Sequence, residues 1–253
     1  MASVSIIIIA KNEIENIAGC VISAQLVSDD IIVIDSGSTD NTQAIAKLNG
    51  ARVLDIQWNG FGDARNKGVE IARYNWILAV DADERITDRL ANAINQLHLD
   101  TTNIVFGFKR RSFWEKKMIR FGEWGRDVVY RLYNKEYVHW NNNPVHEHLE
   151  TGNVKKEMID GIMLHYTMKN FRECKEKIIR YAGLSAAKYA QQKKKGGVIK
   201  EYFSPVFSFI QNYFFRLGFL DGKEGIIIAW STAYYTWLKY YNLKQLYKKT
   251  AIK

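Results

Sequence analysis

Apolar runs alternate with helical patterns over the first hundred residues. Four runs predict strands: 4–10, 30–35 and 76–80, which are almost wholly apolar or β-branched, and a shorter one at 51–56. The intervening stretches 16–24, 42–48 and 66–73 have helical spacing, and a glycine-broken loop at 60–65 precedes the last of them. Strands that alternate with helices are typical of a parallel sheet wrapped by helices. The first part of the chain therefore predicts an α/β fold.

The pattern changes after residue 87. A helix at 88–97 and strands at 104–110 and 161–166 are expected, whereas residues 111–150 are rich in Trp, Tyr, Arg and His without a single period. From Asn170 the spacing is helical, with a lysine- and glycine-rich turn at 193–197. We expect an α/β domain over residues 1–168 and a helical, aromatic-rich region over 169–253.

Polar residues follow three of the predicted strands. Lys11 and Glu13 follow the first, Asp35 ends the second, and Asp81 and Asp83 follow the fourth. The carboxyl ends of parallel strands meet at one edge of a sheet, where ligands bind. Two neighbouring carboxylates repel each other, and a divalent cation, Mg²⁺ or Mn²⁺ with a diphosphate, would relieve that repulsion.

Structural alternatives exist for the same residues. An isolated D-x-D is also common where a strand ends before a helix cap. Asp35 could accept hydrogen bonds from a base or ribose, or could equally cap the turn at 36–39. No G-x-G-x-x-G follows the first strand, and the chain contains no G-x-x-x-x-G-K-[ST]. A nucleotide would therefore be held by carboxylates, backbone and metal rather than by a glycine-rich cradle.

Charge is distributed unevenly along the chain. Residues 1–108 carry a net charge of −6 and residues 109–253 a net charge of +15. Such asymmetry suggests an acidic partner for the second half, either nucleic acid or an anionic membrane surface, although a solvated basic face is the alternative. Cys20 and Cys174 have no metal-binding spacing and are expected to be free thiols in a reducing cytoplasm. No signal peptide is expected.

Four sequence blocks resemble those of family 2 glycosyltransferases, in order and spacing. They are Ser5–Glu13, Ile31–Thr42, Gly62–Gly68 and Leu78–Glu84. Further residues resemble a narrower branch that adds a β-linked hexose to the lipopolysaccharide inner core: Trp124, Arg131–Tyr133, Val145–Glu147, and Gly218–Gly222 with Gly225. The resemblance implies a GT-A fold, a nucleotide-diphosphate sugar as donor, and inversion at the anomeric carbon.

The resemblance also implies roles for single residues. Asp35 would contact the uracil or ribose, Asp83 would be the principal metal ligand, and Asp81 would lie near the ribose and the metal. The remaining donor-site positions would be Ala10, Lys11, Glu13, Arg65 and Ala82. Lys11 departs from the tyrosine often found at its position, so stacking on the base is not implied.

A displacement at C1 needs a carboxylate to take the proton of the acceptor hydroxyl. Glu147 is the first candidate and Asp127 the second, with a salt bridge to a nearby arginine as the alternative for Glu147. His165 could reach the metal or the diphosphate, or could simply be packed.

Arg126 and Arg131 could bind phosphates of an acidic acceptor, because guanidinium groups match phosphate geometry. Trp124 could stack on a sugar ring, with core packing as the alternative.

Aromatic residues and flanking lysines characterise the C-terminal region. Apolar residues recur at helical spacing from Phe203 to Leu217, and residues 226–238 are rich in Trp and Tyr. No run of 18 apolar residues occurs, so a helix lying in the interface of an anionic membrane is expected rather than a spanning one. A helical pair packed on the first domain, or a dimer contact, is the alternative.

These observations predict a cytoplasmic enzyme bound peripherally to the inner face of the cytoplasmic membrane. It would be a metal-dependent inverting transferase that passes a hexose from a UDP-sugar to a lipid-linked saccharide, such as a lipopolysaccharide core. Transfer to another envelope glycan is an alternative. A nucleotidyltransferase would need a glycine-rich triphosphate loop, which is missing. A basic nucleic-acid-binding protein is a different class, but the acidic first half would repel a phosphate backbone.

Overall fold

The computed structural model describes residues 3–101, 103–141, 148–168, 170–194 and 196–251. It divides the chain into two compact units: unit 1 comprises residues 1–110 and 128–165, and unit 2 comprises residues 111–127 and 166–253. The chain therefore passes between the units three times. The division into an α/β catalytic domain at 1–168 and a helical region at 169–253 stays a prediction.

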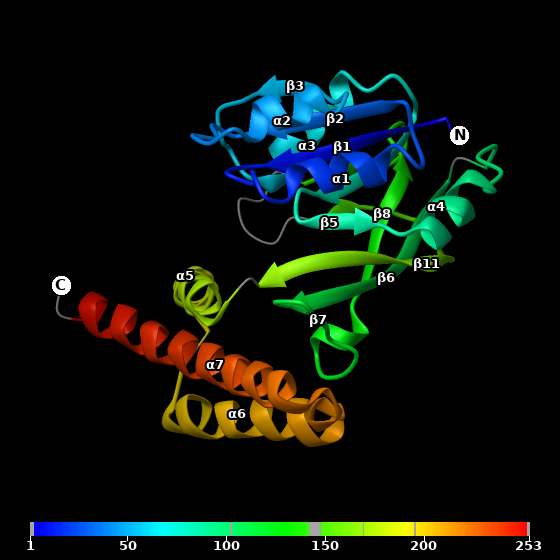
Figure 1. Ribbon diagram of the computed structural model, residues 1–253. Helices are drawn as coiled ribbons and strands as arrows, with labels where there is room; N and C mark the ends of the chain where they lie inside the picture. Colours follow the sequence, from blue (N-terminus) through cyan, green and yellow to red (C-terminus); the bar gives the residue numbers. More distant parts are fainter. Residues whose placement is uncertain (1–2, 102, 142–147, 169, 195, 252–253) are drawn as a thin grey trace. The chain divides into compact units, whose positions relative to one another are not determined.

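Unit 1 is built on a parallel sheet (Figure 1). Its parallel strands lie in the order β3-β2-β1-β4, with bounds β1 Val4–Ala10, β2 Asp30–Asp35, β3 Arg52–Asp55 and β4 Trp76–Asp81. Every residue of β1 and β2 is buried. Strands buried on both faces read as continuous apolar runs, which is the pattern that predicted them.

The sheet continues from β4 with antiparallel neighbours in the order β8-β6-β11-β5. These strands are β5 Glu84–Ile86, β6 Ile104–Trp114, β8 Val128–Asn134 and β11 Lys155–Met168. A separate pair is formed by β9 His139–Trp140 and β10 Leu149–Glu150. Both β6 and β11 extend further than their apolar runs predicted, and each continues into unit 2.

Helices cover both faces of the unit 1 sheet. Ile6 and Ile8 of β1 pack with residues of α1 Ile17–Ala24, α2 Thr42–Leu48 and α4 Asp88–Asn95, whereas Ile7 and Ile9 pack with α3 Phe61–Glu70. Alternate side chains of a strand point to opposite faces, so one strand contributes to two cores. The α/β prediction, a GT-A-type sheet flanked by helices with a helical C-terminal extension, is confirmed.

Helix α3 begins earlier than the sequence pattern predicted. Its glycines indicated a loop over 60–65, but the helix starts at Phe61 and includes Gly62 and Gly68. A Cβ on Gly62 would lie 1.9 Å from the carbonyl oxygen of Asn141, and one on Gly68 would lie 2.6 Å from Ile7. These glycines allow close packing of the helix and do not break it.

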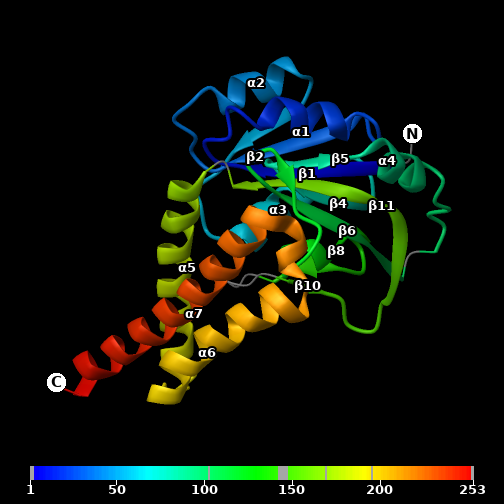
Figure 2. The same ribbon diagram turned by 60° about the horizontal axis from the view of Figure 1, so that its bottom comes forward.

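Unit 2 consists mainly of three helices: α5 Phe171–Gln191, α6 Val198–Ile210 and α7 Gly222–Ala251. Helix α7 packs against both α5 and α6 (Figure 2). A π-helical turn, η2 Gln211–Phe215, and a 3₁₀ turn, η3 Gly218–Asp221, join α6 to α7. In the part of the chain that the structure describes, we find no helix of sufficient length and apolarity to span a bilayer.

The C-terminal helices also hold the segment Arg111–Asp127, which includes β7 Lys117–Met118 and η1 Trp124–Arg126. The Asp221 carboxylate accepts hydrogen bonds from the backbone N–H groups of Arg120 and Phe121, the latter at 2.8 Å. Asn212 accepts one from the Glu123 N–H, also at 2.8 Å. This irregular segment is therefore ordered by residues about a hundred positions later in the sequence.

Candidate functional site

The predicted convergence of strand ends is present at the carboxyl edge of the parallel sheet. Ala10 is the register partner of Asp35, and Ile9 is the partner of Asp81. The Ala82 N–H donates to the Ile9 carbonyl at 3.3 Å, so the turn after β4 is attached to β1. The fold thus brings Ala10, Asp35, Asp81 and Ala82 to one edge.

Asp35 is fully buried, and its carboxylate accepts four hydrogen bonds. Two come from the N–H groups of Gly37 and Ser38, at 3.1 and 2.8 Å, and one from the Ser38 hydroxyl at 2.6 Å. The fourth comes from the Gln43 side chain at 2.9 Å. Asp35 therefore shapes its own turn, as one of the two sequence interpretations proposed. Its contact with a nucleoside stays a prediction.

The loops after β1 and β2 are joined by hydrogen bonds. Asn12, at φ 54°, accepts from the Thr39 N–H at 2.8 Å, and its own N–H donates to the Ser38 hydroxyl at 2.8 Å. The Glu13 N–H donates to the Thr42 hydroxyl at 2.8 Å. These bonds join the two loops into one surface, and the side chain of Lys11 is exposed there.

A cluster of carboxylates and guanidinium groups lies at the end of β4. Asp81 contacts Arg65 at 2.7 Å and Arg131 at 2.9 Å. Glu84, which is fully buried, contacts Arg131 at 3.0 Å and Arg110 at 2.9 Å. The Glu84 carboxylate also accepts the Asp81 N–H at 2.9 Å. Arg131 of β8 joins the carboxylates of β4 and β5, and Arg110 attaches β6 to the same cluster.

The cluster keeps Asp81 ionised. Burial alone would raise the pKa of the Asp81 carboxyl, but the positive charges of Arg131 and Arg65 outweigh burial and hold this pKa well below its ordinary value. The Arg65 guanidinium also lies over the ring of Trp140, 4.3 Å from its centroid. Asn66 of the same helix exchanges hydrogen bonds with the backbone of Trp140.

Asp83 has a different partner. It lies in the turn between β4 and β5, and its carboxylate oxygen is 3.3 Å from Nε2 of His165. The pairing of β11 with β5 sets this approach, because His165 is the register partner of Glu84. The two side chains are 20 and 15% exposed, so an ion could reach them.

A carboxylate and an imidazole are both metal ligands. Asp83 and His165 therefore fit a divalent cation, whereas both oxygens of Asp81 face guanidinium groups. Over the described ranges no group of three or more His, Cys, Asp or Glu side chains could hold an ion. Two of the three predicted ligands thus lie together, and the metal role of all three stays a prediction.

The remaining candidate residues lie elsewhere or outside the described ranges. Glu147, the first candidate base, falls among residues 142–147, which the structure does not describe. Trp124, Arg126 and Asp127 belong to unit 2. The Trp124 ring lies 6.1 Å from that of Trp114 and packs on an apolar cluster, whereas Arg126 is exposed.

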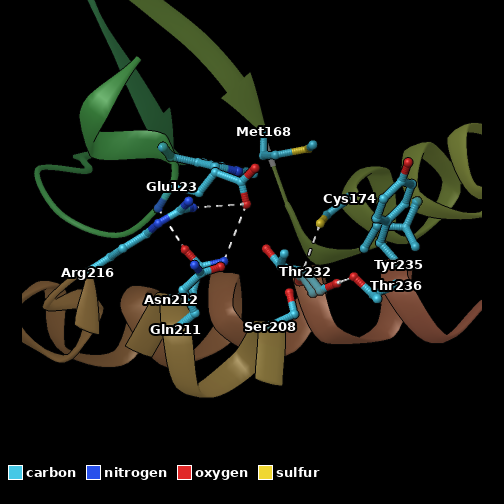
Figure 3. A pocket seen from close by; sticks show the side chains of 13 residues that line it. Glu123, Met168, Cys174, Ser208, Gln211, Asn212, Arg216, Thr232, Tyr235 and Thr236 are labelled. Carbon is cyan, nitrogen blue, oxygen red and sulfur yellow. Dashed lines mark hydrogen bonds and ion pairs between the residues drawn. The ribbon is translucent and has the colours of Figure 1, made fainter. Parts of the chain in front are cut away.

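Trp124 also lines an open pocket of about 370 Å³ in unit 2 (Figure 3). The lining combines polar side chains with apolar ones such as Met168 and Ile178. In Figure 3, Asn212 and Arg216 point toward Glu123 at one end, while Cys174 points toward the helix that carries Thr232 at the other. The hydroxyl-bearing residues among the lining are Ser208, Ser231, Thr232, Tyr235 and Thr236.

Sequence reasoning gave no role to Glu84 and Arg110. The one signal for Glu84 was its place directly after D-A-D, as a third carboxylate in four residues. Its complete burial is unusual for a glutamate and was not visible in the sequence. Arg110 gave none, because its approach to Glu84 depends on how distant strands pair. Arg131 was predicted as an acceptor residue, and its contacts in the structure are with the carboxylates of Asp81 and Glu84.

The structure thus defines an α/β protein whose parallel sheet carries, at its carboxyl edge, a D-x-D turn beside Arg65 and Arg131. The chain belongs to glycosyl transferase family 2, whose family model matches residues 5–159, more than half of the sequence. The recognition made from the sequence blocks is confirmed.

Relatives of the whole chain have related descriptions. An uncharacterized glycosyltransferase of Rickettsia typhi is 26% identical over 99% of this chain and 89% of its own length. The lipopolysaccharide core biosynthesis glycosyltransferase LpsC of Rhizobium meliloti is 26% identical over 98% of this chain and 93% of its own. A crystal structure of glucosyl-3-phosphoglycerate synthase from Mycobacterium tuberculosis, in complex with Mn²⁺, UDP and glucosyl-3-phosphoglycerate, matches 44% of each chain at 26% identity with a TM-score of only 0.35.

Proposed function

We propose that this family 2 glycosyltransferase moves a hexose from a UDP-sugar to a lipid-linked saccharide, with inversion at C1. The observation that carries the proposal is the carboxyl edge of the unit 1 sheet, where Asp83 and His165 lie together beside the Asp81 cluster. The full-length similarity to LpsC supports a lipopolysaccharide core as acceptor. Such an acceptor would place the reaction at the cytoplasmic face of the membrane, with the enzyme bound peripherally.

The donor would lie along the surface formed by the loops after β1 and β2. Ala10, Lys11 and Glu13 would line the nucleoside, and Asp35 would meet the uracil or ribose. In the structure Asp35 already has four partners, so it would either exchange one of them or act by holding Gly37 and Ser38 in place. Arg65 and Ala82 would lie on the nucleotide side of the D-x-D turn.

Asp83, with His165, would hold a divalent cation, Mg²⁺ or Mn²⁺, and Asp81 would stay near the ribose. When bound, the cation stabilises the negative charge that develops on the leaving diphosphate. Arg65 and Arg131 keep Asp81 ionised and fix its direction through contacts of 2.7 and 2.9 Å.

A carboxylate on the other side of the sugar would take the proton of the attacking hydroxyl, a step that contributes roughly 10²–10⁴ in rate. Glu147 is our first candidate for this base and Asp127 our second. Trp124, Arg126 and Arg131 are our candidates for contact with the acceptor.

Ligand-dependent melting would test the donor site directly. We expect UDP-sugars with Mn²⁺ to raise the Tm of the full chain, since a ligand at a hundredfold excess over its Kd adds about 2.7 kcal/mol. GDP- and CDP-sugars should have less effect, and chelation of the metal should remove the shift.

The same assay on variants ties the shift to the site. Asp83→Asn should lose the Mn²⁺-dependent shift, whereas Asp100→Asn, a matched change at an exposed position, should keep it. A protein that no sugar nucleotide stabilises, with or without Mn²⁺, would contradict the proposal. Transfer of sugar to an acceptor other than lipopolysaccharide would favour another envelope glycan, and salt-dependent binding to oligonucleotides without UDP binding would favour a nucleic-acid-binding protein.

A further inference from the structure

Helix α6 exposes its apolar side. Six residues form this side and are between 37 and 73% exposed: Ile199, Tyr202, Phe203, Val206, Phe207 and Ile210. Their spacing of three and four residues places them on one stripe of the helix. The exposed stripe continues into the turns that follow, at Phe214, Phe215, Leu217, Phe219 and Leu220.

The opposite side of α6 is turned inward and carries polar residues beside the buried Pro205. Glu201 is only 4% exposed and contacts Lys244 of α7 at 2.7 Å. Ser208 and, in the following turn, Asn212 point into the pocket of Figure 3. A helix on a water-exposed surface normally shows the reverse arrangement. An exposed apolar stripe of this length therefore marks a surface that meets something other than water.

The charges around this stripe are mainly positive, and the two partly exposed carboxylates near it, Glu123 and Glu224, are paired with Arg216 and Lys117. Among the described residues of 193–223, the exposed or half-exposed charged side chains are all positive: Lys193, Lys194, Lys200, Arg216 and Lys223. The two acidic residues of the same stretch, Glu201 and Asp221, are each 4% exposed. An apolar stripe flanked mainly by positive charge complements a surface that is apolar inside and negative outside.

We propose that α6 and the turns η2 and η3 bind an anionic phospholipid bilayer, with the aromatic stripe lying in the interface and the lysines at the headgroups. A second copy of the chain fits less well, because pairing two such faces would bring like charges together. Helix α6 has 13 residues, which suits lying in the interface and is too short for crossing the hydrocarbon core. This inference rests on the proposed function insofar as a lipid-linked acceptor resides in the same layer.

Vesicle flotation with the full chain tests the inference without donor or acceptor. We expect recovery with phosphatidylcholine vesicles that contain phosphatidylglycerol, weaker recovery with phosphatidylcholine alone, and loss of most binding at high salt. The double variant Phe203→Ser/Phe207→Ser should bind at least about tenfold more weakly, because two aromatic side chains no longer enter the interface. The matched control is Ile22→Ser/Leu48→Ser, two exposed apolar residues of unit 1, which should bind as the parent does.

Circular dichroism and melting of each variant establish that it is folded, which is expected because the substituted side chains are exposed. Equal flotation of the Phe203→Ser/Phe207→Ser variant and the parent would overturn the proposal. So would a parent that ignores anionic vesicles, or one that forms a dimer through this face and loses the dimer in the double variant. Loss of UDP-sugar binding with vesicle binding intact would instead count against the proposed function alone.

Discussion

Replacing Glu84 with glutamine should destabilise unit 1 more than any exposed Glu→Gln change. Glu84 is fully buried and accepts three donors: Arg110 on one oxygen, and Arg131 together with the Asp81 N–H on the other. Glutamine has nearly the same shape but only one oxygen. In either orientation its NH₂ group faces a donor, and one negative charge beside the arginines is lost.

The size of the effect follows from the burial of the pair. Removing one partner of a buried ion pair costs roughly 3–5 kcal/mol, because the remaining charge stays buried. One kcal/mol lowers Tm by about 2–4 °C in chains of 150–250 residues, so we expect a fall of roughly 6–20 °C. Differential scanning calorimetry, or urea denaturation followed by circular dichroism, measures this directly.

Glu136→Gln provides the matched control. Glu136 belongs to the same unit and is exposed, and glutamine can still accept the hydrogen bond that the Asn75 side chain donates at 3.0 Å. Its Tm should be unchanged. A Glu84→Gln protein that melts within a degree or two of the parent would refute the reasoning, because it would mean that Arg110 and Arg131 need no buried carboxylate.

Three further changes test the packing and the charges of the fold. Gly62→Ala should lower the free energy of unfolding by about 1–3 kcal/mol, because its Cβ would meet the Asn141 carbonyl. Gly183→Ala, which has open space around it, should raise the free energy of unfolding by about 0.5–1 kcal/mol. Equal effects of the two changes in calorimetry would contradict this. Burial alone would raise the pKa of Asp30, but a hydrogen bond from Ser5 and other donors lowers it. Asp30 therefore adds stability above about pH 4 that is lost as pH falls through its folded pKa. The Tm difference between the parent and Asp30→Asn should be constant from pH 7 to 5 and shrink in stronger acid; a difference that grows on acidification would show that the sign is wrong.

Much of the unit 1 core was predictable because it is local. The buried strands are visible as apolar runs. The meeting of the carboxylates at one edge of the sheet follows from the parallel order of those strands. The start of α3 was not predictable, because Gly62 looks like a break until the close approach of the Asn141 carbonyl is known. The sequence alone does not distinguish a glycine that allows close packing from a glycine that belongs to a loop.

The interactions that order the site were less accessible to sequence reasoning. Glu84 of β5 meets Arg110 of β6 and Arg131 of β8 only because these strands, far apart in sequence, join one sheet, and no local pattern encodes that arrangement. The inverted polarity of α6 was likewise hidden. Its aromatic spacing was visible, but which side faces water depends on Lys244, which pairs with Glu201 from 43 positions away.

Because the two units are built from interleaved segments of the chain, neither unit can be completed early during synthesis on the ribosome. Unit 1 lacks its last strand residues until His165 has been made, and the segment Arg111–Asp127 meets Asp221 only after about 90 further residues. At roughly 5–20 residues per second, that segment waits on the order of 5–20 s as a Trp- and Arg-rich stretch without its native partners. A nascent chain of this kind depends on steady elongation, and a pause between these positions would prolong its exposure to chaperones and proteases.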